Sequence, residues 1–310
     1  MTRLWALIGM FAVLSCVSHA ALAGRTLASN ATASAVMLKA VKNWGVQLQN
    51  VDPRAIAQLN TLDLVAIEPM VDAAAGIALT PAQVLAMKRK SDGSRRLVIA
   101  YLSVGEAASY RPYWQQDWQR QPPPWLGTTN PNWPGAHGVH FWEPAWQRIV
   151  FDAPASMLDD IIKAGFDGVF LDRIDAYRDW EGQRPTAAQD MIDMVSKLAA
   201  KARFLSPEFL VVGQNSEALL ANNAYMAAID AVSKESLLFG VNGEAVENSG
   251  EQIAWSLGPL LAAKGAGLPV LAIEYLGDPS QQTRARERLR EHGFVPFIGN
   301  RLLDRTPIVP

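Results

Sequence analysis

The chain has 310 residues, of which 49% are hydrophobic, so it is long enough to bury one large core or two smaller ones. Its 28 lysine and arginine residues nearly balance 30 aspartate and glutamate residues. The sequence therefore carries no basic stripe that would neutralise a run of phosphates, and we predict that nucleic acid is not a partner.

The first 23 residues have the pattern of a signal peptide. A basic start at Arg3 precedes an apolar run over residues 4–17 and a small-x-small cleavage site at residues 21–23. The run is shorter than the roughly 20 residues that a membrane span needs, and no later segment matches one. We therefore predict a secreted or periplasmic protein with no integral membrane span. Lipoprotein anchoring through Cys16, the only cysteine, is a weaker alternative because the Leu-Ser pair before it fits the lipidation pattern poorly.

Residues 24–40 are predicted to form a linker and N-terminal segment. Short runs of apolar and β-branched residues then alternate with helix-like segments, which is typical of strands and helices in turn. Eight such runs occur, at residues 44–49, 64–68, 97–104, 168–172, 210–215, 231–235, 269–275 and 294–300. Helices are expected between them, among others at residues 153–164, 187–205, 249–263 and 281–291.

This alternation predicts an α/β fold. Strands that alternate with helices pair in parallel through right-handed crossovers, and eight of them suit a closed (β/α)8 TIM barrel. An open doubly wound sheet would normally carry a glycine-rich phosphate turn after its first strand, where this chain has QLQNVD at residues 47–52. We therefore expect residues 41–305 to fold as a single barrel domain.

Polar side chains gather where these strands end, and that end of a barrel carries its active site. Capping of the following helices would explain any one of them, but their accumulation on one rim favours a binding site. The residues expected to bind substrate are Gln47, Glu68, Tyr101, Glu106, Asp175, Asn215, Glu274, Tyr275 and Asn300.

Two of the acids have the geometry of a catalytic pair. Asp172 ends the fourth strand and Glu235 the sixth, and each inward layer of a barrel is built from alternate strands. Glycoside hydrolysis needs two such carboxylates, one protonated and one ionised. We predict Asp172 as nucleophile or base and Glu235 as general acid. A pairing of Asp172 with Glu274 of the seventh strand is the alternative.

Six of the ten tryptophans lie between the third and fourth strands. Trp142 and Trp146 are expected to pack in a core. Trp125 and Trp133 stand among prolines and asparagines, and we expect them on a rim loop where their rings would stack on sugars.

Metal-dependent and serine-nucleophile schemes fit the sequence less well. His137 and His140 have a possible ligand spacing, but an isolated HxxH pair is weak evidence for a metal site. The chain has no Gly-x-Ser-x-Gly elbow. We therefore predict neither a metal nor a cofactor.

Six motifs occur in a fixed order along the chain. They are YLSVGEA (101–107), GFDGVFLDRIDAY (165–177), GQNSE (213–217), SKES (233–236), IEYL (273–276) and PFIGNRLLD (296–304). Together they resemble glycoside hydrolase family 114, the endo-α-1,4-polygalactosaminidases and their bacterial relatives, which include the hydrolase domains linked to Pel-type exopolysaccharide. The similarity covers roughly residues 44–304, and the motif at 165–177 is the most specific.

The resemblance implies a (β/α)8 barrel that cleaves α-1,4-linked galactosamine- or N-acetylgalactosamine-containing polysaccharide internally, with Asp172 and Glu235 as the catalytic pair. Fungal members usually read PDN where this chain has LDR at residues 171–173, so Arg173 could change which charge state of the polymer is accepted. A polymer with free amino groups would favour an acidic groove, for which four acids are available: Glu68, Glu106, Asp175 and Glu274.

A reading from a different class is a non-catalytic carbohydrate-binding barrel involved in exopolysaccharide handling. Two converging carboxylates argue against it, because binding alone would not need them.

Overall fold

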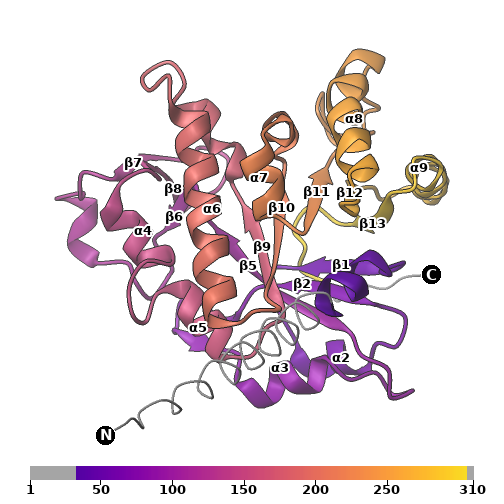
Figure 1. Ribbon diagram of the computed structural model, residues 1–310, viewed down its shortest axis with the longest axis horizontal. Helices are drawn as coiled ribbons and strands as arrows, with labels where there is room; N and C mark the ends of the chain where they lie inside the picture. Colours follow the sequence, from indigo (N-terminus) through magenta and orange to yellow (C-terminus); the bar gives the residue numbers. More distant parts are fainter. Residues whose placement is uncertain (1–32, 306–310) are drawn as a thin grey trace, which may run out of the picture.

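The computed structural model describes residues 33–305, and a nearly closed barrel of eight parallel strands forms its centre (Figure 1). The strands pair in this order: β1 (Trp44–Gln47), β2 (Leu64–Ile67), β5 (Leu97–Ser103), β9 (Gly168–Asp172), β10 (Leu210–Gln214), β11 (Ala231–Glu235), β12 (Val270–Tyr275) and β13 (Val295–Gly299). These are the eight strands predicted from the sequence, so the (β/α)8 barrel is confirmed. The predicted signal peptide and most of the linker lie outside the described residues.

Helices surround the barrel and begin at clear sequence signals (Figure 1). Ser249 and Thr80 form capping boxes with the glutamine three residues later, and Asp52 and Asp278 cap helices whose first residue is proline. The helices are α2 (Pro53–Gln58), α3 (Pro81–Met87), α4 (Pro144–Val150), α5 (Met157–Lys163), α6 (Ala187–Leu205), α7 (Asn223–Ala228), α8 (Gly250–Gly265) and α9 (Pro279–Glu291), with a further short helix over residues 33–39. Across residues 33–305, no helix is both long and apolar enough to cross a bilayer.

The strand alternation divides the apolar side chains between two cores. Alternate residues such as Phe170 and Ile273 fill the inside of the barrel, and their strand neighbours pack outward against the helices. The same alternation carries Tyr101, Asp172 and Tyr275 inward at the strand ends. The barrel interior thus sets the direction of the side chains at the rim.

Trp44 closes the seam between the first and last strands. Its indole Nε1 donates a hydrogen bond to the carbonyl oxygen of Val295, at 2.9 Å. The ring is fully buried and packs on Phe170 and Phe297, with centroids 6.2 Å and 6.0 Å away. Trp44 therefore joins β1 to β13 and fills the barrel interior at the N-terminal end of the strands.

We expect Trp44→Ala to lower the free energy of unfolding by about 3–5 kcal/mol, because it removes a large buried ring and leaves a cavity at the seam. Urea unfolding measures this loss. Trp133→Ala is the matched control, since Trp133 is 42% exposed and its loss should change stability by less than about 0.5 kcal/mol. Equal losses in the two variants would contradict the role of the seam.

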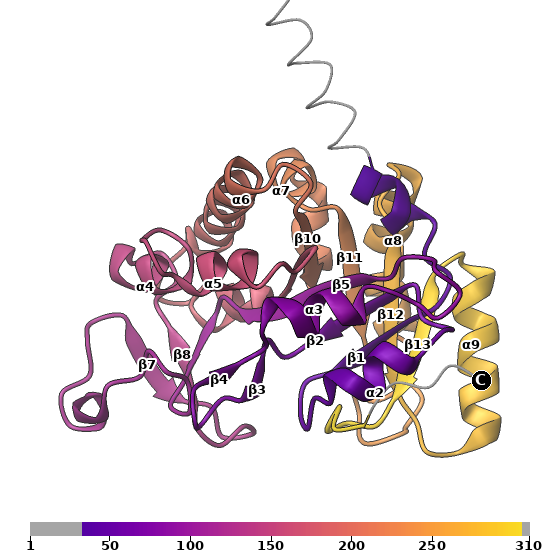
Figure 2. The ribbon, with the colours of Figure 1, turned by 90° about the horizontal axis from the view of Figure 1, so that it is seen from below.

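The segment between β5 and β9 is more ordered than the sequence indicated. It forms a three-stranded antiparallel sheet of β6 (Glu106–Ala108), β8 (Ala136–Val139) and β7 (Leu126–Thr129), with the 3-10 helix η1 (Gln116–Gln119), to one side of the barrel (Figure 2). A short hairpin, β3 (Met70–Asp72) and β4 (Ile77–Ala78), follows β2.

Tryptophans attach this insert to the core on the outside of the barrel. The ring of Trp125 lies 5.0 Å from both Trp118 and Trp146, centroid to centroid, and is 3% exposed. The expectation that Trp125 lies on a rim loop is therefore wrong, because Trp125 is buried in the core that packs on the outside of the barrel. The expected packing of Trp146 is confirmed, and Trp133 lines the cavity described next.

Candidate active site

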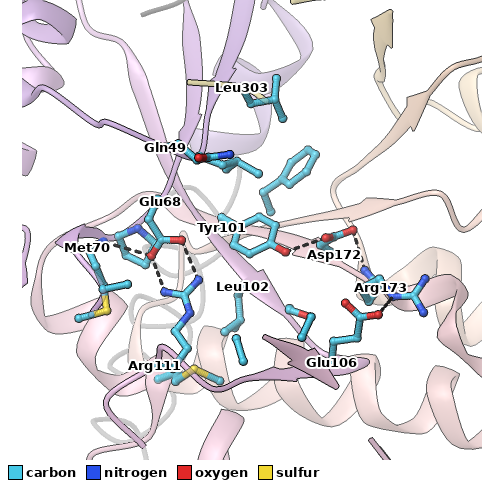
Figure 3. Close-up of a pocket in the computed structure, with 18 of the residues that line it drawn as sticks. Gln49, Glu68, Met70, Tyr101, Leu102, Glu106, Arg111, Asp172, Arg173 and Leu303 are labelled. Atoms are coloured by element: carbon cyan, nitrogen blue, oxygen red, sulfur yellow. Dashed lines mark hydrogen bonds and ion pairs between the residues drawn. The ribbon is translucent and has the colours of Figure 1, made fainter. Parts of the chain in front are cut away.

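A cavity opens at the C-terminal ends of the barrel strands and extends outward to helix α5, with a total volume of about 1300 Å³ (Figure 3). Eight of the eleven residues predicted for the site line it: Glu68, Tyr101, Glu106, Asp172, Asp175, Asn215, Glu235 and Tyr275. Both predicted catalytic acids are among them. The structure thus brings most of the polar strand ends to one place.

Asp172, the last residue of β9, is held by two donors. The Tyr101 hydroxyl donates to Oδ2 at 2.7 Å, and the backbone N–H of Arg173 donates to Oδ1 at 2.8 Å (Figure 3). Burial raises the pKa of Asp172 to about 6, and the nearby charge of Glu235 adds to that rise. The two donors therefore fix the orientation of the Asp172 carboxylate, and the pKa of Asp172 depends on the charge of Glu235.

Glu235, the last residue of β11, has a similar set of partners. The Tyr275 hydroxyl donates to Oε2 at 2.6 Å, and Asn215 donates to Oε1 at 2.9 Å. Asn215 also accepts the backbone N–H of Glu235 at 3.2 Å, so one amide holds both the main chain and the side chain. Asp172 and Glu235 thus each have one tyrosine, and they reach the cavity from alternate strands with β10 between them.

Arg173 neutralises part of the acidic rim. It has a left-handed backbone with φ of 60°, and its guanidinium lies 3.0 Å from Glu106 Oε1, 3.4 Å from Asp175 Oδ1 and 2.7 Å from Asp179 Oδ2 (Figure 3). Arg111 likewise binds Glu68 through both carboxylate oxygens, the longer contact being 2.7 Å. The acidic groove expected from Glu68, Glu106 and Asp175 is therefore largely paired with arginines, which sequence reasoning missed.

The chain before β6 passes directly against the loop that follows Asp172. A Cβ added at Gly105 would collide with the carbonyl oxygen of Arg173 and with Cβ of Ala176. Only glycine allows this close approach of two backbones. The insert and the loop of Asp172 are thus packed together at Gly105.

Two predicted binding residues brace loops instead of lining the cavity. Gln47 is buried, and its amide donates to the carbonyl oxygens of Gln49 and Asn50, at 3.1 Å and 2.8 Å. Asn300 donates to Asp304 Oδ1 at 2.6 Å. Polar residues at strand ends also form hydrogen bonds within the neighbouring loops. The sequence pattern alone therefore could not distinguish residues that hold a loop from residues that line the cavity.

Glu274 also lies outside the cavity, and its prediction as a binding residue is corrected. Ile273 and Tyr275 face into the barrel, so Glu274 faces out and is 0% exposed. Its carboxylate accepts the backbone N–H groups of Leu238 and Phe239 at 2.7 Å and 3.2 Å. Burial raises the pKa of Glu274 to about 7. The alternative pairing of Glu274 with Asp172 is therefore wrong.

The histidines of the HxxH pair are part of aromatic stacks. His137 lies on Trp114 and His140 on Trp142, with ring centroids 4.9 Å and 5.0 Å apart. In the part of the chain that the structure describes, no group of three or more His, Cys, Asp or Glu side chains is placed to hold a metal ion.

Comparison with known proteins identifies the family. Residues 24–309 match the sequence profile of glycoside-hydrolase family GH114. The chain belongs to this family. An uncharacterised protein of Deinococcus radiodurans is 36% identical to this GH114 member over 274 residues, which cover 86% of this chain and 83% of that protein. A second, from Methanocaldococcus jannaschii, is 31% identical over 270 residues, covering 82% of this chain and 74% of that protein.

Two solved structures share the fold of this GH114 chain. The glycoside hydrolase domain of PelA from Pseudomonas aeruginosa superposes with a TM-score of 0.65 at 23% identity, over 86% of this chain and 98% of that domain. Ega3 of Aspergillus fumigatus, solved in complex with galactosamine, gives a TM-score of 0.61 at 19% identity, over 85% of this chain and 92% of Ega3. The resemblance inferred from the six motifs is thereby confirmed.

Proposed function

We propose that this GH114 member is an exported, endo-acting hydrolase of α-1,4-linked galactosamine- or N-acetylgalactosamine-containing polysaccharide. The observation that carries the proposal is that Asp172 and Glu235, each held by a tyrosine, line one cavity at the C-terminal rim of a GH114 barrel. The galactosamine bound to Ega3 supports the choice of sugar. Export rests on residues 1–23, which lie outside the described residues.

In this proposal, Glu235 is the general acid and Asp172 the nucleophile or base. Glu235 gives its proton to the glycosidic oxygen as the bond from that oxygen to the anomeric carbon breaks. Asp172 either bonds to the anomeric carbon, as a nucleophile, or acts as a base and takes a proton from the water that attacks the anomeric carbon. Where Asp172 bonds to the sugar, water then hydrolyses the intermediate and returns a proton to Glu235. The tyrosines and Asn215 hold both acids in place during these steps.

Defined oligomers of galactosamine and of N-acetylgalactosamine test the proposal directly. We expect incubation to release shorter oligomers cut at internal linkages, with the products read by mass spectrometry. Binding without new reducing ends over long incubation would favour the non-catalytic barrel.

The pH dependence of cleavage tests the roles of the two acids. Because Asp172 must be ionised to act as nucleophile or base, and burial raises its pKa to about 6, we expect kcat/KM to fall about tenfold per pH unit below pH 6. The Tyr101 hydrogen bond lowers the pKa of Asp172, so Tyr101→Phe should move this acidic limb to higher pH. A loss of activity above pH 6, in place of the loss below it, would assign Asp172 as the acid.

A further inference from the structure

A second, smaller cavity of about 260 Å³ adjoins the first at Glu235. The two cavities share four lining residues: Asp175, Asn215, Glu235 and Arg301. A polymer that crosses the catalytic acids can therefore continue from one cavity into the other. The residues that line only the second cavity come from the 3-10 helices η2 (Ile174–Asp179) and η3 (Glu217–Ala221), from β11 and the loop after it, and from helix α8.

The carboxylates of this second cavity are all engaged by donors of the protein. Glu217 is buried, 2.9 Å from Lys234 Nζ and 2.7 Å from the Ser256 hydroxyl. Asp175 lies 3.4 Å from Arg173, and Glu235 accepts hydrogen bonds from Asn215 and Tyr275 as described above. The charges of Glu217 and Asp175 are thus partly balanced by Lys234 and Arg173, whereas Glu235 is held by neutral donors.

Two guanidiniums line the second cavity, those of Arg178 and Arg301, and Arg301 also lines the first cavity. Within residues 33–305, Arg178 and Arg301 form no ion pair with a carboxylate, whereas Arg111 and Arg173 of the first cavity do. Arg178 lies over the ring of Trp255 and Arg301 over the ring of Tyr275, at 4.7 Å and 5.0 Å from the ring centroids. Both groups are therefore positioned by aromatic rings, with N–H donors left for a ligand.

We propose that this second cavity is a sugar subsite that selects a non-cationic unit carrying a carbonyl or carboxylate oxygen. This inference rests on the proposed function and specifies its substrate: cleavage is favoured where such a unit, acetylated or acidic, occupies the second cavity. Planar guanidiniums bind carbonyl and carboxylate oxygens well, whereas Arg178 and Arg301 would repel an ammonium group placed beside them. Trp255, which is 51% exposed, adds an apolar ring for the sugar.

Cleavage of three linear hexamers tests the selection. They are galactosamine with all amines free, alternating galactosamine and N-acetylgalactosamine, and alternating galactosamine and galacturonate. We expect the wild type to cut at least one of the alternating hexamers with a higher kcat/KM than the hexamer whose amines are all free. The alternating hexamer with the higher kcat/KM shows whether the subsite prefers a carbonyl or a carboxylate oxygen. Arg178→Gln and Arg301→Gln should each reduce that preference about tenfold, since each removes a charged hydrogen-bond donor.

Arg120→Gln is the matched control, because Arg120 is exposed and lies outside both cavities. A preference that is absent in the wild type, or unchanged in both variants, would overturn the subsite while leaving the proposed function intact. If no hexamer is cut, the proposed function fails. Calorimetric binding of N-acetylgalactosamine and galacturonate disaccharides, compared between wild type and Arg178→Gln, then decides the subsite separately, and equal affinities would reject it.

Discussion

Asp172→Asn and Glu235→Gln are each expected to lower kcat on galactosamine oligomers by about 10³-fold or more. Each substitution keeps the size of the side chain but removes the charge or the proton that the reaction needs, and acid-base groups typically contribute 10²–10⁴-fold. The measurement is release of reducing ends under substrate saturation. Both side chains line the cavity, so the melting temperature should stay close to that of the wild type.

Glu181→Gln is the control for these variants, because Glu181 is an exposed acid outside the cavities and should leave kcat unchanged. Full activity in either cavity variant would remove that residue from the mechanism. A variant that loses activity together with its melting transition would require comparison at a temperature where it is folded.

Glu274 is expected to make the protein less stable as pH rises. Its pKa is about 7 in the folded protein, against 4.5 for the free group, so the unfolded chain ionises first. The stability contributed by the protonated form is complete below pH 4.5 and is lost as pH rises toward 7. Between pH 5 and pH 8, we expect this group to lower the free energy of unfolding by about 2–3 kcal/mol.

Urea unfolding of the wild type and of Glu274→Gln, each at pH 5 and pH 8, isolates this effect. The difference in unfolding free energy between the two proteins should change by that amount, because glutamine does not titrate. An unchanged difference would contradict the raised pKa. The same variant should retain far more activity than Glu235→Gln, since Glu274 contacts the backbone of residues 238 and 239 and not the cavity.

The barrel could be predicted because its signals are local. Each strand is a short apolar run between turn residues, so the residues that identify a strand all lie within a few positions of one another in the sequence. The position of Asp172 and Glu235 at the ends of alternate strands followed from the same pattern. The error at Glu274 was avoidable in principle: neighbouring residues of a strand face opposite sides, so Glu274 and Tyr275 could not both line the cavity.

The insert and the charge balance of the rim could not be predicted in the same way. The sheet of β6, β8 and β7 depends on antiparallel pairing between residues far apart in the chain, such as Glu106 with Gly138. This pairing buries Trp125, which in sequence stands among prolines that indicate a loop. The partners of Glu68 and Glu106 are likewise fixed by tertiary contacts, with Arg111 and Arg173, that no spacing rule reveals.

The close contact at Gly105 limits how this chain can diverge. Lengthening the insert in the exposed segment over residues 119–122, which lies outside both cavities, adds solvent-facing chain and leaves the Asp172 loop undisturbed. Any side chain at position 105, by contrast, would press on the backbone one residue beyond Asp172. We therefore expect homologues to differ in the outer surface of the insert and to keep glycine at position 105.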